Sequence, residues 1–259
     1  MLRNNYLTGL CLNARGAMEF MKKIILAVTL ILFCAQAYSQ TLVIGRIEGA
    51  PDHQLGAAII EEAYKRINVV VEFKVFPGQR ALVQSSSGKV DGEMQRIYEV
   101  GDLYPTLIRV PTPFTYMDAA VFSKDEKIVV SGWSSLNDYK VGIVRGDKYA
   151  EIGLRDVENV VLVSGTKSLL RMLDAGRVDI VVTTIFDGLY GAKKHQMQSI
   201  RPIYPILARI PLYFYLHEKN KHLVAEIDRV FKSMQQSGEL EELRLKFAKE
   251  LLNDPLFEQ

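Results

Sequence analysis

Short apolar runs rich in β-branched residues alternate along the chain with stretches whose apolar positions follow a helical spacing. The run 42–45 predicts a strand, and the apolar residues of 57–67 recur at the spacing of a helix. The run 69–76 predicts a second strand, and 80–86 predicts a helix that Gly88 ends. Strand and helix therefore alternate, which is typical of a sheet whose strands run largely parallel.

The alternation starts again after the charged segment 124–127. This second part contains predicted strands at 140–144, 160–163 and 179–183 and a predicted helix at 167–174. The chain then continues with a β-rich run, 211–217, and two amphipathic helices between residues 223 and 248. We therefore expect an α/β protein with two units, and a ligand in the cleft between them, at the carboxyl ends of the strands.

The first forty residues have a different pattern, which is typical of a secretory leader. The basic segment 21–23 precedes an apolar run, 24–33, and the small residues of 35–37 fit a signal-peptidase site. A run of roughly ten apolar residues is shorter than the ~20 that span a bilayer. We therefore expect residues 1–40 to form a leader with a cleaved signal peptide, and the mature protein to be periplasmic.

The leader also contains both cysteines of the chain. Translation is expected to start at Met18 or Met21, which gives the leader an ordinary length. Because Cys11 and Cys34 lie in the removed part, the mature chain has no thiol, disulfide or cysteine-ligated metal. Lipid attachment at Cys34 is the alternative, and the bulky Phe33 before it argues against that reading.

The charge balance excludes one class of partner. The leader holds four of the 32 basic residues and one of the 30 acidic residues, so the remaining chain is close to neutral. A near-neutral chain without long basic runs lacks the electrostatic footprint of a nucleic-acid-binding protein. With 48% apolar and 24% charged residues, the composition is that of a globular protein.

Two pairs of segments carry a resemblance to a known family. In the first part, 76–82 is followed by 88–96, and in the second part 139–147 is followed by 173–179. Each pair contains a Gly-x-Val-Asp turn that links a helix to a strand. In this respect the chain resembles the family 3 bacterial extracellular solute-binding proteins, the periplasmic components of polar amino-acid uptake systems.

The resemblance implies a two-lobed periplasmic binding protein fold of the type II kind, with mainly parallel sheets joined by a two-segment hinge. The first lobe would comprise 41–122 plus 206–259, and the second lobe 123–205. It also implies a monomer that binds a small polar solute, an amino acid or related organic acid, and closes around it. An ABC-type uptake transporter would be the membrane partner.

The sequence departs from the amino-acid binders of the family at two positions. In those proteins the carboxylate-binding arginine ends a Ser/Thr-x-Thr-x-x-Arg element well after the first aspartate, whereas Arg96 follows Asp91 by five positions. Those proteins also resemble one another in an aspartate that meets the ligand's amine, where this chain has Thr184. The solute is therefore not named by the sequence.

Three charged residues are predicted to bind the solute. Arginine is expected where the solute is a carboxylate or phosphate, because its planar fork donates paired charge-assisted hydrogen bonds. Arg80 and Arg96 lie near predicted strand ends, and Glu48 follows the first strand, where it can receive a ligand cation. The alternatives are a solvated or ion-paired arginine and an ordinary surface carboxylate.

Four uncharged residues complete the predicted ligand contacts. Thr166 begins a predicted helix, where free backbone amides favour an anion, although capping explains the same residue. Thr184 is included for its position after the second aspartate. Phe114 and Tyr116 offer apolar walls or stacking faces, and core packing is the alternative for both.

Catalytic motifs are missing from the sequence, so we expect a binding protein and not an enzyme. It contains no Gly-x-Ser-x-Gly elbow and no phosphate-binding glycine loop. His217 and His222 are five positions apart, roughly 140° around a helix, so they do not share a metal, and we expect neither a metal nor a cofactor. Two alternatives stay open: a sensing subunit for a membrane receptor, and a dehydratase that uses Glu48 or Glu93 as its acid.

Overall fold

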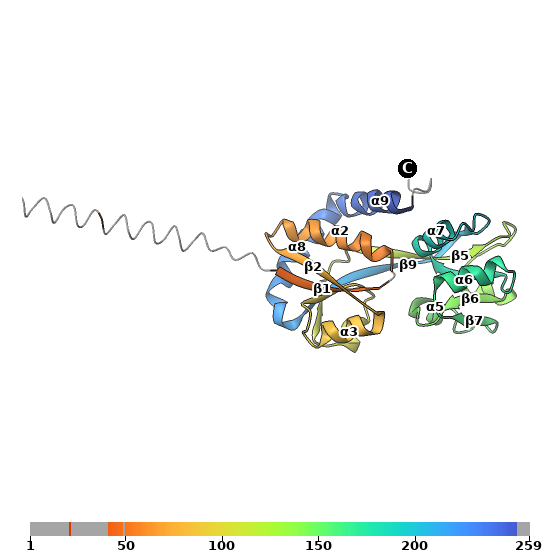
Figure 1. Ribbon diagram of the computed structural model, residues 1–259, viewed down its shortest axis with the longest axis horizontal. Coiled ribbons are helices and arrows are strands. Elements are labelled where there is room, and N and C mark those ends of the chain that lie inside the picture. Colours follow the sequence, from red (N-terminus) through yellow and green to blue (C-terminus); the bar gives the residue numbers. More distant parts are fainter. Residues whose placement is uncertain (1–20, 22–40, 49, 253–259) are drawn as a thin grey trace, which may run out of the picture. The chain divides into compact units, whose positions relative to one another are not determined.

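The computed structural model describes residue 21 and residues 41–48 and 50–252. The chain divides into two compact units, 1–40 and 41–259, and the strands and helices labelled in Figure 1 belong to the second. Apart from Met21, the predicted leader, with its signal peptide, start codon and lipid site, lies outside the described residues. Within the described residues, no helix is long and apolar enough to cross a membrane.

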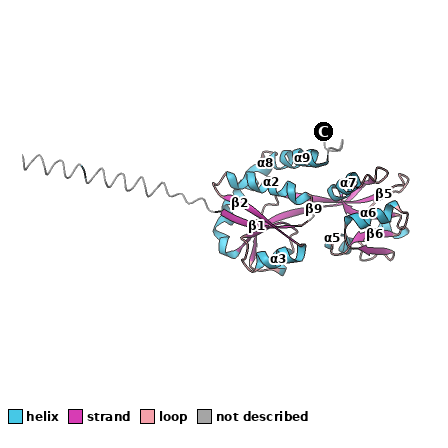
Figure 2. Ribbon diagram, viewed as in Figure 1, coloured by secondary structure: helices cyan, strands magenta, loops and turns pink. Residues whose placement is uncertain are grey.

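Strands and helices alternate in the first half of this unit, as the sequence predicts (Figure 2). The elements are β1 (Thr41–Ile47), α2 (Asp52–Lys65), β2 (Val70–Phe76), α3 (Gly78–Ser86), β3 (Gly92–Arg96), α4 (Val100–Leu103), β4 (Leu107–Arg109) and β5 (Thr115–Ser123).

The second half continues the alternation and ends with two helices. Its elements are η1 (Trp133–Asp138), β6 (Val141–Val144), α5 (Lys148–Gly153), β7 (Val160–Val163), α6 (Thr166–Asp174), β8 (Ile180–Thr184), α7 (Ile185–Lys194), β9 (Arg201–His217), η2 (Glu218–Leu223), α8 (Val224–Gln236) and α9 (Glu239–Leu252).

The strands pair in two groups that share β9. In the first group β1 lies between β2 and β3 and runs parallel to both, while β3 and β4 pair antiparallel with the end of β9. In the second group β6 runs parallel to β7 and β8, and β5 joins β8 to the earlier part of β9. The α/β class with mainly parallel units is confirmed.

We call the elements from β1 to β4, with α8, the first lobe, and those from β6 to α7 the second lobe. Strands β5 and β9 connect them, because β9 pairs with β5 up to Leu212 and with β3 from Tyr213 onward. Figure 1 shows β9 running from one lobe into the other. The predicted lobe bounds, 41–122 plus 206–259 and 123–205, stay a prediction.

The apolar faces of the helices explain how the first lobe is held together. Helix α2 buries Ile59, Ile60 and Tyr64 against a core that also contains Ile44 of β1 and Phe231 of α8. These side chains are fully or almost fully removed from solvent, each worth about 1.5–3 kcal/mol of burial free energy. The final helices of the chain thus complete the core that its first strand begins.

Helix α7 is not predicted by the sequence pattern. Its segment contains Gly188 and Gly191, and glycine lowers helix stability by about 1 kcal/mol. In the structure the two glycines permit close packing, since a Cβ at Gly188 would collide with the ring of Phe122 and one at Gly191 with Leu170. The helix is therefore stabilised by tertiary contacts that a local pattern does not reveal.

Candidate binding site

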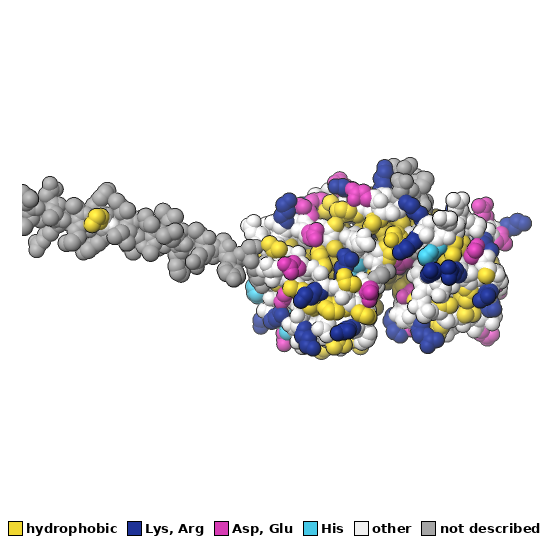
Figure 3. Space-filling model, viewed as in Figure 1, with side chains coloured by type: hydrophobic (Ala, Val, Ile, Leu, Met, Phe, Trp, Pro, Cys, Tyr) yellow, Lys and Arg dark blue, Asp and Glu magenta, His cyan; other side chains and the backbone are white. Residues whose placement is uncertain are grey.

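Three carboxylates gather where strands of both lobes end. Asp52 begins α2 after β1, Asp147 follows β6, and Asp187 lies in the first turn of α7 after β8. The charge of Asp187 acts on Asp52 and on Asp147, and that of Asp147 acts on Asp52, so the three lie near one another across the lobes. We call them the carboxylate cluster. Figure 3 shows the surface hollowed between the lobes.

The surroundings of the carboxylate cluster disfavour three negative charges. Burial, followed by the charge of Asp187, raises the pKa of Asp52 to about 8. Burial, followed by Asp187 and Glu151, raises the pKa of Asp147 to about 7, and burial raises the pKa of Asp187 as well. Each of the three side chains still keeps some contact with solvent. Near neutral pH the free cluster therefore retains protons.

The cluster also lacks a cationic partner. None of the ion pairs formed by the described residues includes Asp52, Asp147 or Asp187. Gln95 donates a long hydrogen bond of 3.5 Å from Nε2 to Asp52 Oδ2, and the buried Tyr149 hydroxyl lies beside the side chain of Thr183. Burial and the charges of Asp147 and Asp187 hold the pKa of Tyr149 well above its usual range. The carboxylate oxygens are thus acceptors that a ligand can use.

A metal ion does not fit this arrangement. In the part of the chain that the structure describes, no three His, Cys, Asp or Glu side chains are placed to hold a metal. The carboxylates are near enough to influence one another's pKa, but they do not converge on one point as metal ligands do. An ammonium group with several donors meets such a spread of acceptors better.

A second set of polar groups lies on the first-lobe side, around β3. Arg96 Nε donates to Oε1 of the fully buried Glu93 at 2.8 Å, and Arg96 also donates to the Gly78 carbonyl at 3.0 Å. Glu93 Oε2 is buried without a partner, and burial raises the pKa of Glu93. Burial, with the charges of Arg96 and Arg46, lowers the pKa of His53 to about 3. His53 is therefore neutral, and Arg96 is engaged with Glu93.

The predicted charged contacts are not brought together. Arg80 is exposed on α3 and Glu48 is exposed after β1, while Arg96 turns to Glu93 as described. Thr166 is the first residue of α6 and is half-buried. None of the four makes a hydrogen bond or ion pair with the carboxylate cluster, and their ligand roles stay predictions.

The two predicted aromatic contacts lie near the connecting strands. Phe114 is 1% exposed and packs against the rings of Phe214 and Phe231. Tyr116, two residues further on, lies between the guanidinium groups of Arg209 and Arg244. Neither ring is paired with a residue of the carboxylate cluster, and core packing accounts for Phe114.

Thr184 is the predicted residue nearest to the cluster in sequence. It is buried at the end of β8, and its hydroxyl caps α7 by accepting a hydrogen bond from the Asp187 backbone N–H at 3.0 Å. Thr184→Ala should therefore lower the free energy of unfolding by about 1 kcal/mol, measured by urea denaturation. Thr184→Ser, which keeps the hydroxyl, should restore most of it. Equal stability of the Ala variant and the parent would contradict the capping role.

Sequence reasoning missed Asp52, Asp147, Asp187 and Tyr149. The signal that points to them is their place: each lies within about five residues after a strand, at the edge where α/β proteins bind ligands. The arginines and the family positions point instead to Arg80, Arg96 and Thr184.

Comparisons with known proteins agree with this fold. No family model matches the sequence. An uncharacterized protein of Shewanella oneidensis is 28% identical over 187 residues, which is 70% of each chain. A histidine kinase sensor domain with similarity to periplasmic binding proteins is 21% identical, with a TM-score of 0.60 over 80% of this chain and 96% of that one.

Two further solved structures are similar over the same extent. An ancestral arginine-binding protein bound to arginine is 20% identical with a TM-score of 0.63, covering 80% of this chain and 97% of that one. The probable amino-acid ABC transporter extracellular-binding protein of Bacillus subtilis is 18% identical with a TM-score of 0.68 and the same coverage. At these identities the likeness establishes the fold, and the expected two-lobed fold of the type II kind is confirmed.

Proposed function

We propose that this chain binds a small polar solute carrying an ammonium group, such as an amino acid or a related amine, between its two lobes. The observation that carries the proposal is the carboxylate cluster, to which the first lobe gives Asp52 and the second gives Asp147 and Asp187. None of the three has an ion-pair partner among the residues that the structure describes. A ligand that contacts both lobes favours their closed arrangement through its higher affinity for that state.

The first experiment is calorimetric titration of the chain from Thr41 onward. The panel contains arginine, lysine and putrescine, the N-acetylated forms of the same compounds, and succinate as an organic acid without an amine. The proposal expects binding by at least one amine and its loss on acetylation of that amine. Binding of succinate alone would overturn the proposal that the solute carries an ammonium group. It would favour instead the prediction that Arg80 and Arg96 bind a carboxylate.

We propose in addition that the bound form is delivered in the periplasm to an ABC-type uptake transporter. The likeness to the binding protein of such a transporter in Bacillus subtilis supports this, at the level of fold. The test is uptake of the labelled solute by cells with and without the gene. Loss of uptake on deletion supports delivery, and unchanged uptake of a solute that the protein binds excludes it.

The likeness to a histidine kinase sensor domain supports a second candidate, a sensing protein. Such a protein would use the same cleft but pass its closed state to a receptor. In the deletion strain a sensing role would leave uptake unchanged and abolish a solute-dependent change in transcription. The same pair of strains therefore distinguishes delivery from sensing.

A further inference from the structure

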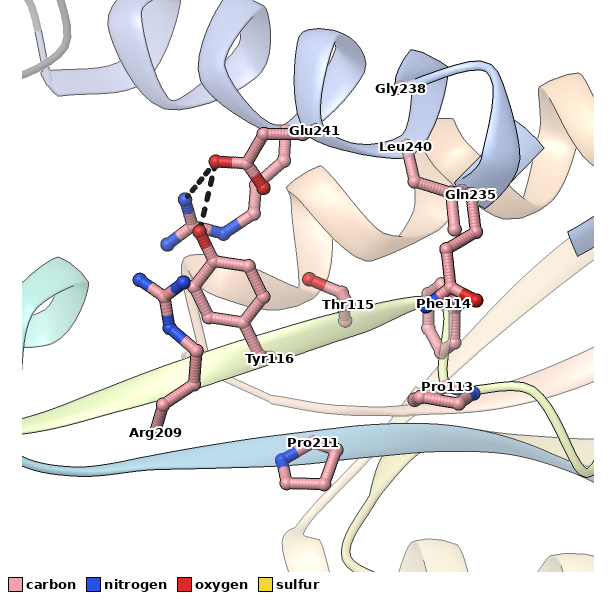
Figure 4. Close-up of a pocket in the computed structure, with 11 residues that line it drawn as sticks. Pro113, Phe114, Thr115, Tyr116, Arg209, Pro211, Gln235, Gly238, Leu240 and Glu241 are labelled. Carbon is pink, nitrogen blue, oxygen red and sulfur yellow. Dashed lines mark hydrogen bonds and ion pairs between the residues drawn. The ribbon is translucent and has the colours of Figure 1, made fainter. Parts of the chain in front are cut away.

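Tyr116 is held in an unusual environment on the strand that connects the lobes. Its ring lies between the guanidinium groups of Arg209 of β9 and Arg244 of α9, whose Cζ atoms are 3.9 and 3.8 Å from the ring centroid. Its hydroxyl donates a hydrogen bond of 2.9 Å to Glu241 of α9 (Figure 4). We call Tyr116, Arg209, Glu241 and Arg244 the Tyr116 cluster.

The cluster ties three segments together. Arg209 is fixed by a bidentate ion pair with Asp118 of β5, with donor–acceptor distances of 2.7 and 2.9 Å. The side chain of Arg244 is only 12% exposed, and its Nη1 atom lies 3.5 Å from Oε1 of Glu241. Cation–π contacts and hydrogen bonds to charged groups are each modest alone, but here they act on one ring from both sides. Strands β5 and β9 and helix α9 are therefore held in one arrangement.

The position of the cluster matters because β5 and β9 join the lobes. Tyr116 pairs with Pro211 and Asp118 pairs with Arg209 in the ladder of these strands. The change of partners along β9, from β5 to β3, occurs between Leu212 and Tyr213. A rotation of one lobe against the other would have to alter the backbone near this point.

Helix α9 extends the connection to both lobes. Glu239 at its start forms an ion pair with Arg66, just after α2 of the first lobe. At its other end the Leu252 carbonyl accepts a hydrogen bond of 2.6 Å from Lys193 of α7 in the second lobe. Figure 1 shows α9, in dark blue, alongside α2 with its later end toward α7. The helix thus reaches from one lobe to the other, with the Tyr116 cluster in between.

The space beside the cluster leaves it free to rearrange. A cavity of about 230 Å³ is lined by Tyr116, Pro113, Leu240 and other residues of β5, β9, α8 and α9. The buried Thr115 hydroxyl next to it has no hydrogen-bond partner. Close-packed interiors resist movement, whereas side chains that border a cavity can change rotamer without displacing neighbours. The side chains of the Tyr116 cluster can therefore rearrange when the lobes move.

We infer that the Tyr116 cluster positions the two lobes, holding the connecting strands and α9 so that Asp52 comes beside Asp147 and Asp187. In the free protein ionisation of one of these carboxyl groups disfavours ionisation of the others, and the negative charge that the cluster does carry opposes closure. The contacts of the Tyr116 cluster offset this repulsion, and they determine which fraction of the free protein is closed. Tyr116 would then act on solute affinity through the hinge, without contact with the solute.

The test measures the distance between the lobes in the free protein. Spin labels at Val83→Cys on α3 and Ile152→Cys on α5, which are 48% and 61% exposed, report it by pulsed electron paramagnetic resonance. The chain from Thr41 onward contains no other cysteine. In Tyr116→Leu we expect the ratio of closed to open molecules to fall about tenfold. Tyr116→Phe keeps the ring and loses one hydrogen bond, so its effect should be intermediate.

The matched control is Tyr98→Leu. The Tyr98 ring also lies against a guanidinium, that of Arg109 at 3.2 Å, but in the first lobe. Its contact with β9, through the ring of Tyr213, lies in the part of that strand that pairs with β3 and not with β5. Its distance distribution should equal the parent's. An unchanged distribution in a folded Tyr116→Leu protein would overturn the inference. Should that variant fail to fold, Arg244→Gln, which removes one of the two guanidinium groups, gives the same decision.

The inference extends the proposed function but can fail separately from it. The distance measurement uses no solute, so it decides the role of Tyr116 even if no amine in the panel binds. Where an amine does bind, its affinity for Tyr116→Leu should fall in step with the closed fraction. An affinity that falls while the distance distribution stays that of the parent would instead place Tyr116 in direct contact with the solute.

Discussion

Replacing Asp187 by asparagine is expected to weaken the binding of an ammonium-bearing solute by about 100-fold. The amide keeps the shape of the carboxylate and its place after the Thr184 cap, but it removes the charge that we propose meets the ligand. In the half-buried cleft that charge is poorly screened, so its loss leaves the ligand's ammonium desolvated without full compensation. Calorimetric titration of the variant with the amine that the parent binds measures the effect.

The same substitution should make the free protein more stable, by about 1 kcal/mol. Asp187 raises the pKa of both Asp52 and Asp147, so its removal relieves a repulsion that folding brings about. A loss of affinity accompanied by a gain in stability separates a binding role from simple damage to the fold. Asp156→Asn is the matched control, because Asp156 is a second-lobe carboxylate whose side chain is 86% exposed. That control should change neither quantity, and a destabilised Asp187→Asn protein would contradict the prediction.

Solute affinity is expected to rise with pH between about 6 and 9. Binding an ammonium group favours the ionised carboxylates, and in the free protein the pKa values of Asp147 and Asp52 are raised to about 7 and about 8. Below these values the ligand must displace protons, which costs up to tenfold in affinity per pH unit for each proton released. Titrations in two buffers of different ionisation enthalpy count those protons directly.

The stability of the free protein should depend on pH in the opposite direction. The folded pKa of Asp52 lies above its ordinary value of 3.8, so the folded state holds a proton that the unfolded state has lost. This favours the folded state at low pH, and the contribution falls as pH rises from about 4 to 8. Asp52→Asn should flatten the decline in melting temperature over that interval. A solute affinity independent of pH, together with a flat stability profile in the parent, would contradict raised carboxylate pKa values.

The sequence predicts the alternation of strands and helices well, because burial alone produces those patterns. The run 160–163 coincides with β7, and the apolar stripe beyond 223 becomes α8 and α9. The first part of β9 escapes prediction, since Pro202 and Pro205 interrupt a run that is nevertheless paired with β5. There the partner strand, and not the local sequence, determines the structure.

The candidate site was harder to predict, for a physical reason. Asp52 lies ahead of the predicted helix start at residue 57, and Asp187 belongs to a helix that its glycines conceal. A carboxylate at a helix start is also an ordinary surface feature, stabilised by the helix dipole. These aspartates differ from ordinary helix-start carboxylates only because the two lobes bring them close together in space. Asp52 and Asp187 are more than 130 positions apart in the sequence, so no local pattern reveals this.

A ribosome completes the second lobe of this protein before the first. The elements from β6 to α7 are contiguous, whereas the first-lobe core packs Ile60 of α2 against Ile227 and Phe231 of α8. Domains generally fold as units during synthesis. The apolar face of α2 therefore stays uncovered until residues 224–252 have left the ribosome. A partly synthesised chain therefore exposes to chaperones the apolar face of α2, which is buried in the complete protein.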